Sequence, residues 1–214
     1  DGKVLVVGGG KYAKPHNTIE AYDPAVNAWV PQAGLLIARR SHAAVLLEDG
    51  RVLVAGGTDQ GWDQPTSAEL LGHSFGEASR PAGDMFYGYY SNTLTLLEDG
   101  RVLVIGGSTP STEAYDPRAN RWSFAGNMTR ARFAHTATLL ADGRVLAAGG
   151  IDDASASDFV NDSTELFNPV TGLWSQTGSM KEVRHSHTAT LLEDGRVLVV
   201  GGETFSGRHL STSE

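Results

Sequence analysis

The sequence contains no cysteine among its 214 residues. Without a thiol the chain can form no disulfide, no zinc–thiolate site and no cysteine nucleophile. It also has no continuous apolar run of about 18 residues, which a membrane-spanning helix would need. Basic residues are few and unclustered, with 17 Lys and Arg against 25 Asp and Glu. The resulting net charge of −8 disfavours binding to nucleic acid, because such binding depends on neutralising phosphates.

Sequence signatures of common enzymes are scarce as well, since no His-Glu-x-x-His and no Walker loop occurs. Glycine, in contrast, is abundant: the chain has 26 of them, whereas an average protein has about 7%. With 40% hydrophobic residues the chain can bury a core, so it is not expected to be disordered. The glycines fall mostly at repeated positions, which makes internal repeats the first question.

One nonamer recurs five times along the chain. Its copies begin at residues 1, 49, 99, 142 and 194, so successive copies lie 48, 50, 43 and 52 residues apart. A second block, of the type HTATLLE, precedes four of the copies at 42–48, 92–98, 135–141 and 187–193. A third block, of the type STEAYDPRANRW, follows three of them at 18–29, 111–122 and 163–174. It is degenerate at 67–76, and the last residues, 211–214, match its beginning.

Each repeat is typical of four antiparallel strands, which we call a, b, c and d in chain order. The second block and the nonamer are β-rich and are joined by Asp-Gly, which predicts a hairpin with a type I′ turn and positive φ at both central residues. The third block alternates polar and apolar residues as strand c, and Asp-Pro then turns the chain into strand d. The continuous apolar run of strand b predicts burial on both faces.

Paired glycines, then an aromatic residue, then a tryptophan seven positions later resemble the kelch motif of β-propellers. The aromatic residues in this register are Tyr22, Tyr115 and Phe167, whereas the second repeat has Leu71 and no tryptophan. The glycines and tryptophans with this structural role are Gly8, Gly9, Gly56, Gly57, Gly106, Gly107, Gly149, Gly150, Gly201, Gly202, Trp29, Trp122 and Trp174. The resemblance implies an all-β, kelch-type β-propeller of four-stranded antiparallel blades.

We expect a single propeller domain with blades at residues 1–41, 42–90, 91–133, 134–186 and 187–214. The first blade lacks strand a and the fifth ends inside strand c, so about four and a half to five blades are present. This count favours part of a six- or seven-bladed ring over a compact ring of five imperfect blades. An open array would expose an apolar blade face at each end, which favours self-association or contact with further blades.

Sequence variation between repeats is concentrated at one edge of the blades. The a–b and c–d turns share one edge and are nearly uniform, whereas the b–c and d–a loops share the other edge and differ greatly. A uniform scaffold with one diverse edge is typical of a binding face, and tolerated insertions are the alternative. We call this edge the variable-loop face.

Aromatic residues on this face are candidate ligand contacts. Trp62 stands outside the repeat register in a polar b–c loop, where it either pins the loop or contacts a ligand. Residues 85–90, in the next d–a loop, include Tyr87, Tyr89 and Tyr90 and should lie near Trp62. Such a cluster favours carbohydrate stacking or peptide capture; the alternative is a local core that replaces the missing tryptophan of blade 2.

Three arginines, Arg39, Arg132 and Arg184, each lie three residues before a histidine of strand a. Guanidinium groups around a channel mouth would suit a carboxylate, and kelch domains that bind acidic peptides use such arginines, so the resemblance supports ligand binding. Recurrence in register favours the alternative, in which each arginine ties its own loop to a neighbouring blade. His185 is a further candidate contact. The recurring histidines, His42, His135 and His187, are interpreted as blade-to-blade hydrogen-bond donors rather than metal ligands.

The acidic b–c loop of blade 4 raises the question of a cation. Several hard oxygen ligands within a few residues could hold Ca²⁺, although their order does not match an EF-hand loop. A solvated loop is the alternative, and no other cofactor is expected. The residues in question are Asp152, Asp153, Asp158, Asn161 and Asp162.

The sequence favours a non-catalytic binding module that recognises a protein, a peptide or a glycan through the variable-loop face. Galactose oxidase carries similar kelch repeats, but its radical cofactor needs a cysteine cross-linked to a tyrosine, and this chain has no cysteine. The alternative is the propeller portion of a secreted carbohydrate-active or oxidase enzyme whose catalytic residues lie outside this chain. By resemblance alone, repeats of this style suggest a secreted bacterial protein.

Overall fold

The computed structural model of the chain describes residues 2–11, 14–72, 76–152 and 160–214, and every regular element in these ranges is a β-strand. The described residues accordingly include no helix that could cross a membrane. The predicted all-β class is confirmed.

The strands form successive antiparallel sheets, one to each repeat. Three of these sheets have four strands in meander order, as predicted, namely β6-β7-β8-β9, β10-β11-β12-β13 and β14-β15-β16-β17. Blade 2 consists of β6 (Arg40–Leu46), β7 (Val52–Thr58), β8 (Ser67–Leu71) and β9 (Arg80–Asp84). Blade 3 consists of β10 (Thr93–Leu96), β11 (Val102–Ile105), β12 (Ser111–Asp116) and β13 (Arg121–Asn127). Blade 4 consists of β14 (Thr136–Leu139), β15 (Val145–Ala148), β16 (Thr164–Asn168) and β17 (Leu173–Gln176).

The first and last sheets are smaller. Blade 1 contains β1 (Val4–Val7), β4 (Ile19–Asp23) and β5 (Ala28–Gln32), and its b–c loop carries the short pair β2 (Gly10–Lys11) and β3 (Lys14–Pro15). Blade 5 pairs β18 (Thr188–Leu191) with β19 (Val197–Val200). The last residues extend this sheet, since Val199 and Glu214 exchange two backbone hydrogen bonds.

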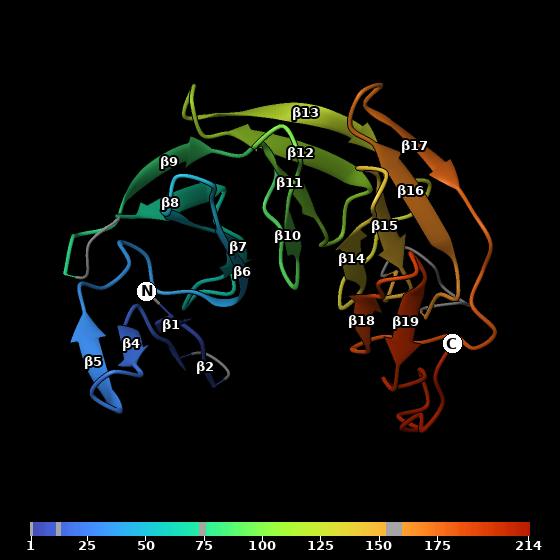
Figure 1. The fold of residues 1–214 in the computed structure, drawn as a ribbon, viewed down its shortest axis with the longest axis horizontal. Coiled ribbons are helices and arrows are strands. Elements are labelled where there is room, and N and C mark those ends of the chain that lie inside the picture. Colours follow the sequence, from blue (N-terminus) through green and yellow to red (C-terminus); the bar gives the residue numbers. More distant parts are fainter. Residues whose placement is uncertain (1, 12–13, 73–75, 153–159) are drawn as a thin grey trace.

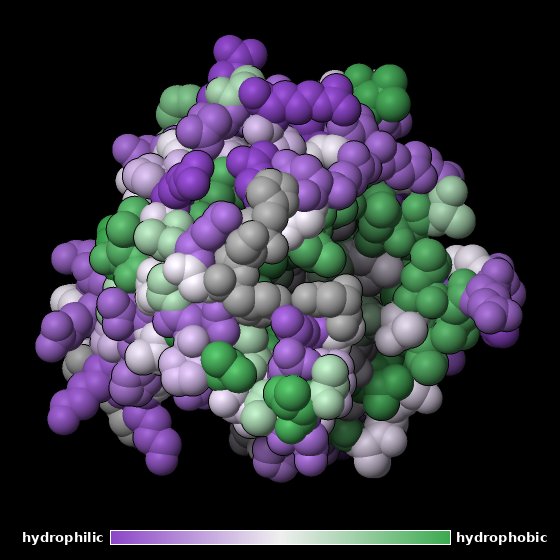
Figure 2. Space-filling view, turned by 60° about the vertical axis from the view of Figure 1, so that its left-hand side comes forward, coloured by the Kyte–Doolittle hydropathy of each residue, from purple (hydrophilic) through white to green (hydrophobic). Residues whose placement is uncertain are grey.

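The five sheets follow one another along an open arc, with their first strands toward its inside (Figure 1). The two smaller sheets stand at the ends of the arc. Blade 1 carries several exposed apolar side chains, among them Val4, Val6 and Trp29, each about half exposed. Figure 2, which turns this side of the molecule forward, shows hydrophobic side chains gathered along one side of the surface and hydrophilic ones over its upper part.

The Asp-Gly hairpins form as predicted, but their turn type differs from the prediction. In blade 2 the amide of Leu47 donates to the carbonyl of Arg51 and the amide of Gly50 donates to Leu47. Only the glycine has positive φ, at 84°, and the Asp49 carboxylate accepts the Arg51 amide instead. The connection is therefore a three-residue loop in which a turn ends in a left-handed glycine, not a two-residue type I′ turn.

Blades 3 and 4 each pack on the preceding blade through their own aromatic pair. In blade 3 the rings of Tyr115 and Trp122 lie 5.1 Å apart, and the Trp122 indole N–H donates to the carbonyl of Ala82 in blade 2. In blade 4 the ring of Trp174, 5.2 Å from that of Phe167, donates to the hydroxyl of Thr112 in blade 3. Trp122, which is buried, and Trp174, which is partly buried, each belong to one blade and pack against the core of the interface with the preceding blade.

Candidate functional site

The three in-register arginines are buried, and each pairs with a glutamate of the blade that follows it in the sequence. Arg132 is fully buried, and its guanidinium group donates to the carbonyls of Gly149 and Ser163 and to the carboxylate of Glu165, 2.6 Å away. Burial lowers the pKa of Arg132, while the Glu165 carboxylate opposes that shift. Arg39 pairs with Glu69 at 3.0 Å and Arg184 with Glu214 at 2.7 Å. These groups therefore join strand a to strand c and present no guanidinium surface to a ligand.

Each paired glutamate also holds the d–a loop that precedes its blade. Glu69 accepts the backbone amides of Leu36 and Ile37, and Glu165 accepts the amide of Thr129. The carboxylate thus binds both the arginine that precedes strand a and the backbone of the d–a loop that carries this arginine. This arrangement matches the interpretation that the recurring arginines tie loops to neighbouring blades.

Tyr89 takes the place of the arginine in blade 3. Its side chain is fully buried, and its hydroxyl donates to the Glu113 carboxylate at 3.1 Å and approaches the Ser111 carbonyl at 3.3 Å. Burial and the neighbouring carboxylate raise the pKa of Tyr89, and burial also raises the pKa of Glu113, which has no arginine partner here. Tyr89 therefore fills the structural position of Arg39, Arg132 and Arg184 and is inaccessible to a ligand.

The recurring histidines form hydrogen bonds between blades, as the sequence predicts. The Nε2 atom of His135 lies 3.1 Å from the Thr93 hydroxyl of blade 3, and that of His187 lies 2.9 Å from the Thr136 hydroxyl of blade 4. Burial is the main cause that lowers the pKa of His135 to about 3 and that of His187 to about 4. Both imidazoles are therefore neutral at pH 7 and act as structural links.

A left-handed residue lies at the start of strand a in blade 2 and just before strand a in blades 3, 4 and 5. Its φ lies between 44° and 53° in every case, although none of the four is glycine. Their backbones bond from blade to blade: the amide of Ser91 donates to Ser41, that of Ala134 to Ser91, and that of Ser186 to Ala134. A repeated left-handed conformation outside glycine needs such support from the surrounding structure.

The residue just before each left-handed position lies at the mouth of the arc's inner surface and differs in every blade. We call Arg40, Tyr90, Phe133 and His185 the mouth residues. Each is partly exposed. Arg40 pairs with Thr58 in the β6–β7 ladder, and Phe133 and His185 form isolated β-bridges to the b–c loops of the blades that follow them. The rings of Tyr90 and Phe133 stack at 4.9 Å, so neighbouring mouth residues are in contact.

Arg40 and Trp62 form a stacked pair on this face. The Arg40 guanidinium carbon lies 3.7 Å from the centroid of the Trp62 ring, and Trp62 is 57% exposed. Among the described residues, no carboxylate lies within salt-bridge distance of Arg40. A guanidinium over an indole is attracted by the ring and keeps its edge N–H groups available.

The loop that carries Trp62 is internally bonded. The side chain of Asp59 accepts the amides of Gly61 and Asp63, while the amide of Trp62 donates to the Asp59 carbonyl. Trp62 itself has a φ of 67°, a conformation that a large side chain adopts only when its surroundings impose it. The indole is therefore presented from a fixed loop.

The 85–90 loop is bonded to the b–c loop that carries Trp62. The amide of Met85 donates to the carbonyl of Thr66, and the amide of Gly57 donates to Tyr89. Phe86 and Tyr87 are 66% and 46% exposed, and their backbone amides donate to Glu113. We call Arg40, Trp62, Phe86 and Tyr87 the loop-face patch.

Comparisons with known proteins agree with this geometry. The Kelch motif matches residues 1–36. The solved structure entitled "Structure of YjhT" superposes with a TM-score of 0.80 at 18% sequence identity, over 100% of this chain and 78% of that chain. No curated protein sequence matches the chain. The chain has the kelch-type β-propeller fold. Within this kelch fold the arginines of the Arg–Glu pairs are buried and the inter-blade tryptophans bond to the preceding blade, whereas the mouth residues differ from blade to blade.

The proposed calcium ligands of the kelch propeller fall partly outside the described residues. Asp153 and Asp158 lie in that segment, whereas Asp152 is buried and Asp162 is partly exposed. In the part of the chain that the structure describes, no three His, Asp or Glu side chains come close enough to hold a metal ion. The calcium site remains a prediction from sequence.

The segment between β8 and β9 contains a Gly-x-Ser-x-Gly pattern, Gly72 to Gly76, that the sequence analysis did not single out. In hydrolases this pattern carries a nucleophile at a sharp turn from a strand into a helix. Here it joins two antiparallel strands of one sheet, and its residues 73–75 lie outside the described residues. The strand-to-helix context that the hydrolase motif needs is not met.

Repeat register led the sequence analysis to Arg39 and away from its neighbour Arg40. It also missed Phe133. The signal that could have found them is the position directly after each in-register arginine or tyrosine, because that position changes from Arg40 to Tyr90, Phe133 and His185 while the preceding one stays nearly constant. Variation within a conserved frame marks an outward-facing position.

Proposed function

We propose that the chain is an interaction module that binds a protein partner through the loop-face patch of its kelch propeller. The observation that carries this proposal is the Arg40–Trp62 stack, on a b–c loop that backbone hydrogen bonds tie to the loop of the exposed Phe86 and Tyr87. Trp, Tyr and Arg side chains dominate the binding energy of protein interfaces. Large aromatic groups held on fixed loops lose little conformational entropy when a partner binds.

The charge of Arg40 indicates one feature of the partner. Arg39, its neighbour in sequence, is neutralised by Glu69, whereas no described carboxylate lies within salt-bridge distance of Arg40. An acidic side chain of the partner would pair with the free edge of this guanidinium and would be oriented by its planar donors. Arg40 therefore contributes specificity to a patch whose remaining members are apolar or amphipathic.

The patch can be tested by crosslinking followed by a binding measurement. A photo-crosslinking amino acid at position 87 captures the partner in cells, and the purified pair is then titrated. We expect Trp62→Ala to weaken binding at least tenfold, the effect of a truncated hot spot, without lowering the melting temperature. Val170→Ala is the matched control, because Val170 is 92% exposed in the c–d turn of blade 4, at the opposite edge.

Two results would oppose the proposal. Equal binding by the Trp62→Ala and Val170→Ala proteins would exclude the patch as the interface. Capture of glycans instead of a protein would assign the same face to a different class of partner. Arg40→Glu tests the charge argument separately, since it should weaken binding more than Arg40→Gln if the partner presents a carboxylate.

A further inference from the structure

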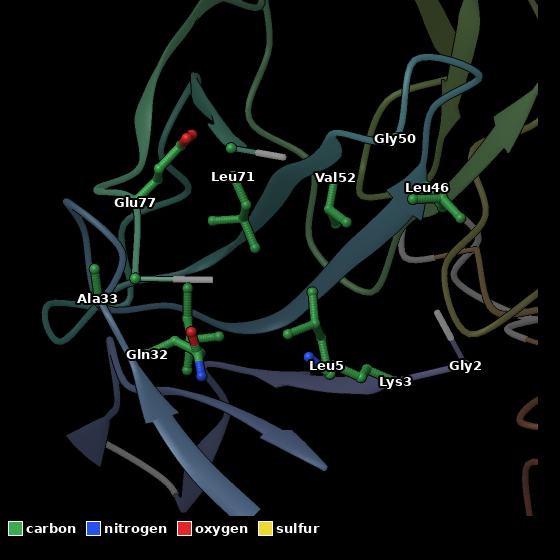
Figure 3. Close-up of a pocket in the computed structure, with 13 residues that line it drawn as sticks. Gly2, Lys3, Leu5, Gln32, Ala33, Leu46, Gly50, Val52, Leu71 and Glu77 are labelled. Atoms are coloured by element: carbon green, nitrogen blue, oxygen red, sulfur yellow. The ribbon is translucent and has the colours of Figure 1, made fainter. Parts of the chain in front are cut away.

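A cleft with a volume of about 440 Å³ lies between blades 1 and 2 (Figure 3). Blade 1 contributes Leu5 and Ile19 to its walls, and blade 2 contributes Leu46, Val52 and Leu71. Its lining also includes Gly50 of the β6–β7 turn, so it opens toward the uniform a–b and c–d edge, away from the variable-loop face. The volume falls within the range of about 300 to 1,000 Å³ that is usual for small-molecule sites.

The corresponding position at the next interface, between blades 2 and 3, is filled by two aromatic side chains. The β7–β8 ladder pairs Val52 with Leu71, and the β11–β12 ladder pairs Val102 with Tyr115. Leu71 therefore occupies the register position of Tyr115. The hydrophobic core at this second interface contains Tyr115, Trp122 and the register equivalents of the cleft walls: Leu53, Ala68, Leu96 and Val102.

The interface between blades 3 and 4 is filled in the same way. Val145 pairs with Phe167, and Phe167 pairs with Trp174 across the next ladder. Both aromatic rings belong to one core that also includes Leu103 and Leu139, the equivalents of Leu5 and Leu46. At the interface between blades 2 and 3 and at the interface between blades 3 and 4, the space that corresponds to the cleft therefore holds a phenol or phenyl ring together with an indole.

The described residues of blade 2 place neither ring at these register positions. Leu71 stands in the aromatic position. In blade 2 Leu70 pairs with Arg80, and in blade 3 the equivalent Ala114 pairs with Ser123. Ser79, which directly precedes Arg80, therefore has the register position of Trp122, which directly precedes Ser123. The Ser79 hydroxyl donates to the Glu69 carboxylate and also lies within hydrogen-bond distance of the Gly34 carbonyl. It is therefore held within the Glu69 network and does not fill the cleft.

We propose that this cleft is a binding site for a planar aromatic ligand of indole size. Its apolar walls stabilise such a ring by removing it from water, and their register equivalents already enclose an indole at the two neighbouring interfaces. There the indole N–H donates to an acceptor on the preceding blade, the Ala82 carbonyl or the Thr112 hydroxyl. The register equivalent of Ala82 in blade 1 is Gln32, which lines the cleft. A ligand with a ring N–H therefore suits the site better than a purely hydrocarbon one.

Indole itself is the probe for the test, with the full chain observed by methyl NMR. We expect saturable shifts and intermolecular NOEs from indole protons to the methyl groups of Leu5, Val52 and Leu71. Leu71→Tyr restores the ring that blade 3 has at this position and should weaken indole binding at least tenfold without lowering the melting temperature. Leu173→Tyr is the matched control, because Leu173 is an exposed leucine of β17 and its replacement should leave binding unchanged.

Three outcomes would overturn the proposal. The first is the absence of saturable binding to the unmodified chain, and the second is equal binding by the Leu71→Tyr and control proteins. The third concerns Phe75, an aromatic residue of this chain that lies outside the described residues. If indole bound the Phe75→Ala protein but not the unmodified one, the cleft would belong to the chain's own side chain. The test is independent of the loop-face patch, which lies at the other edge of the blades.

Discussion

Replacing Arg132 by alanine distinguishes a structural arginine from a ligand contact. Arg132 and Glu165 are both fully buried and joined at 2.6 Å. Removing the guanidinium leaves the carboxylate without its counter-charge in the protein interior, with the Thr129 amide as a remaining donor. Breaking a buried ion pair in this way costs about 3–5 kcal/mol, so we expect the free energy of unfolding to fall by that amount.

The chain itself offers the conservative replacement. Blade 3 carries Tyr89 at this register position, and its hydroxyl donates to Glu113. Arg132→Tyr should therefore keep one donor to Glu165 and recover part of the loss, since a hydrogen bond to a charged group is worth about 1.5–3 kcal/mol. The order of stability expected is unmodified chain, then Arg132→Tyr, then Arg132→Ala.

Urea denaturation at pH 7 measures all three proteins. Arg196→Ala is the control, because Arg196 is 80% exposed in its pair with Asp194 and surface pairs contribute little. The reasoning would be refuted if Arg132→Ala lost less than about 1 kcal/mol, or if the tyrosine variant were no more stable than the alanine variant. Loss of partner binding by a fully stable Arg132→Ala protein would instead return this residue to the binding site.

Three further changes test the scaffold. The pKa of His135 is lowered to about 3, so between about pH 6.5 and pH 3 only the unfolded chain protonates this imidazole. The free energy of unfolding therefore falls as the pH is lowered through this range. His135→Asn should reduce the dependence of this free energy on pH between pH 6 and 4 by up to about 1.4 kcal/mol per pH unit, measured by urea denaturation. Gly150→Ala should lower the free energy of unfolding by about 1–3 kcal/mol, because the φ of Gly150 is 98° and the new methyl group would lie 2.8 Å from the Cβ of His135. Gly178→Ala is the control, because a methyl group at this glycine meets open space, and it should change the melting temperature little. Trp174→Phe removes the indole N–H that donates to Thr112 and should lower the free energy of unfolding by about 1–3 kcal/mol in the same assay.

The repeats predicted the fold because each blade is formed by local pairing. Apolar strands joined by Asp-Gly at a fixed spacing leave little choice but a meander. The turn type was wrong because the sequence pattern alone does not distinguish a two-residue loop from a three-residue one. In the structure, Asp49 keeps negative φ by accepting the Arg51 amide with its side chain, and Gly50 alone takes the left-handed position.

The candidate site was harder to predict than the fold. Sequence register predicts that Arg39, Arg132 and Arg184 share one role. In the structure the three arginines do share a role, which is to pair with a buried or partly buried glutamate instead of facing a ligand. Whether a guanidinium near a channel mouth points inward or outward depends on where its carboxylate partner lies, and Glu69 is 30 residues from Arg39 in sequence. Arg40 escaped notice because no other repeat has an arginine at its register position.

Both sites inferred from this structure lie where the repeats differ from one another. Arg40 is at a position that changes in every blade, and Leu71 replaces the aromatic residue that the first, third and fourth repeats have at its position. In an array whose stability comes from interfaces between neighbours, a change at one interface is felt mainly there. The filled interfaces around Trp122 and Trp174 can therefore hold the fold while the interface between blades 1 and 2 stays open. Restoring an aromatic ring at position 71 should, for the same reason, exchange ligand binding for stability at that interface alone.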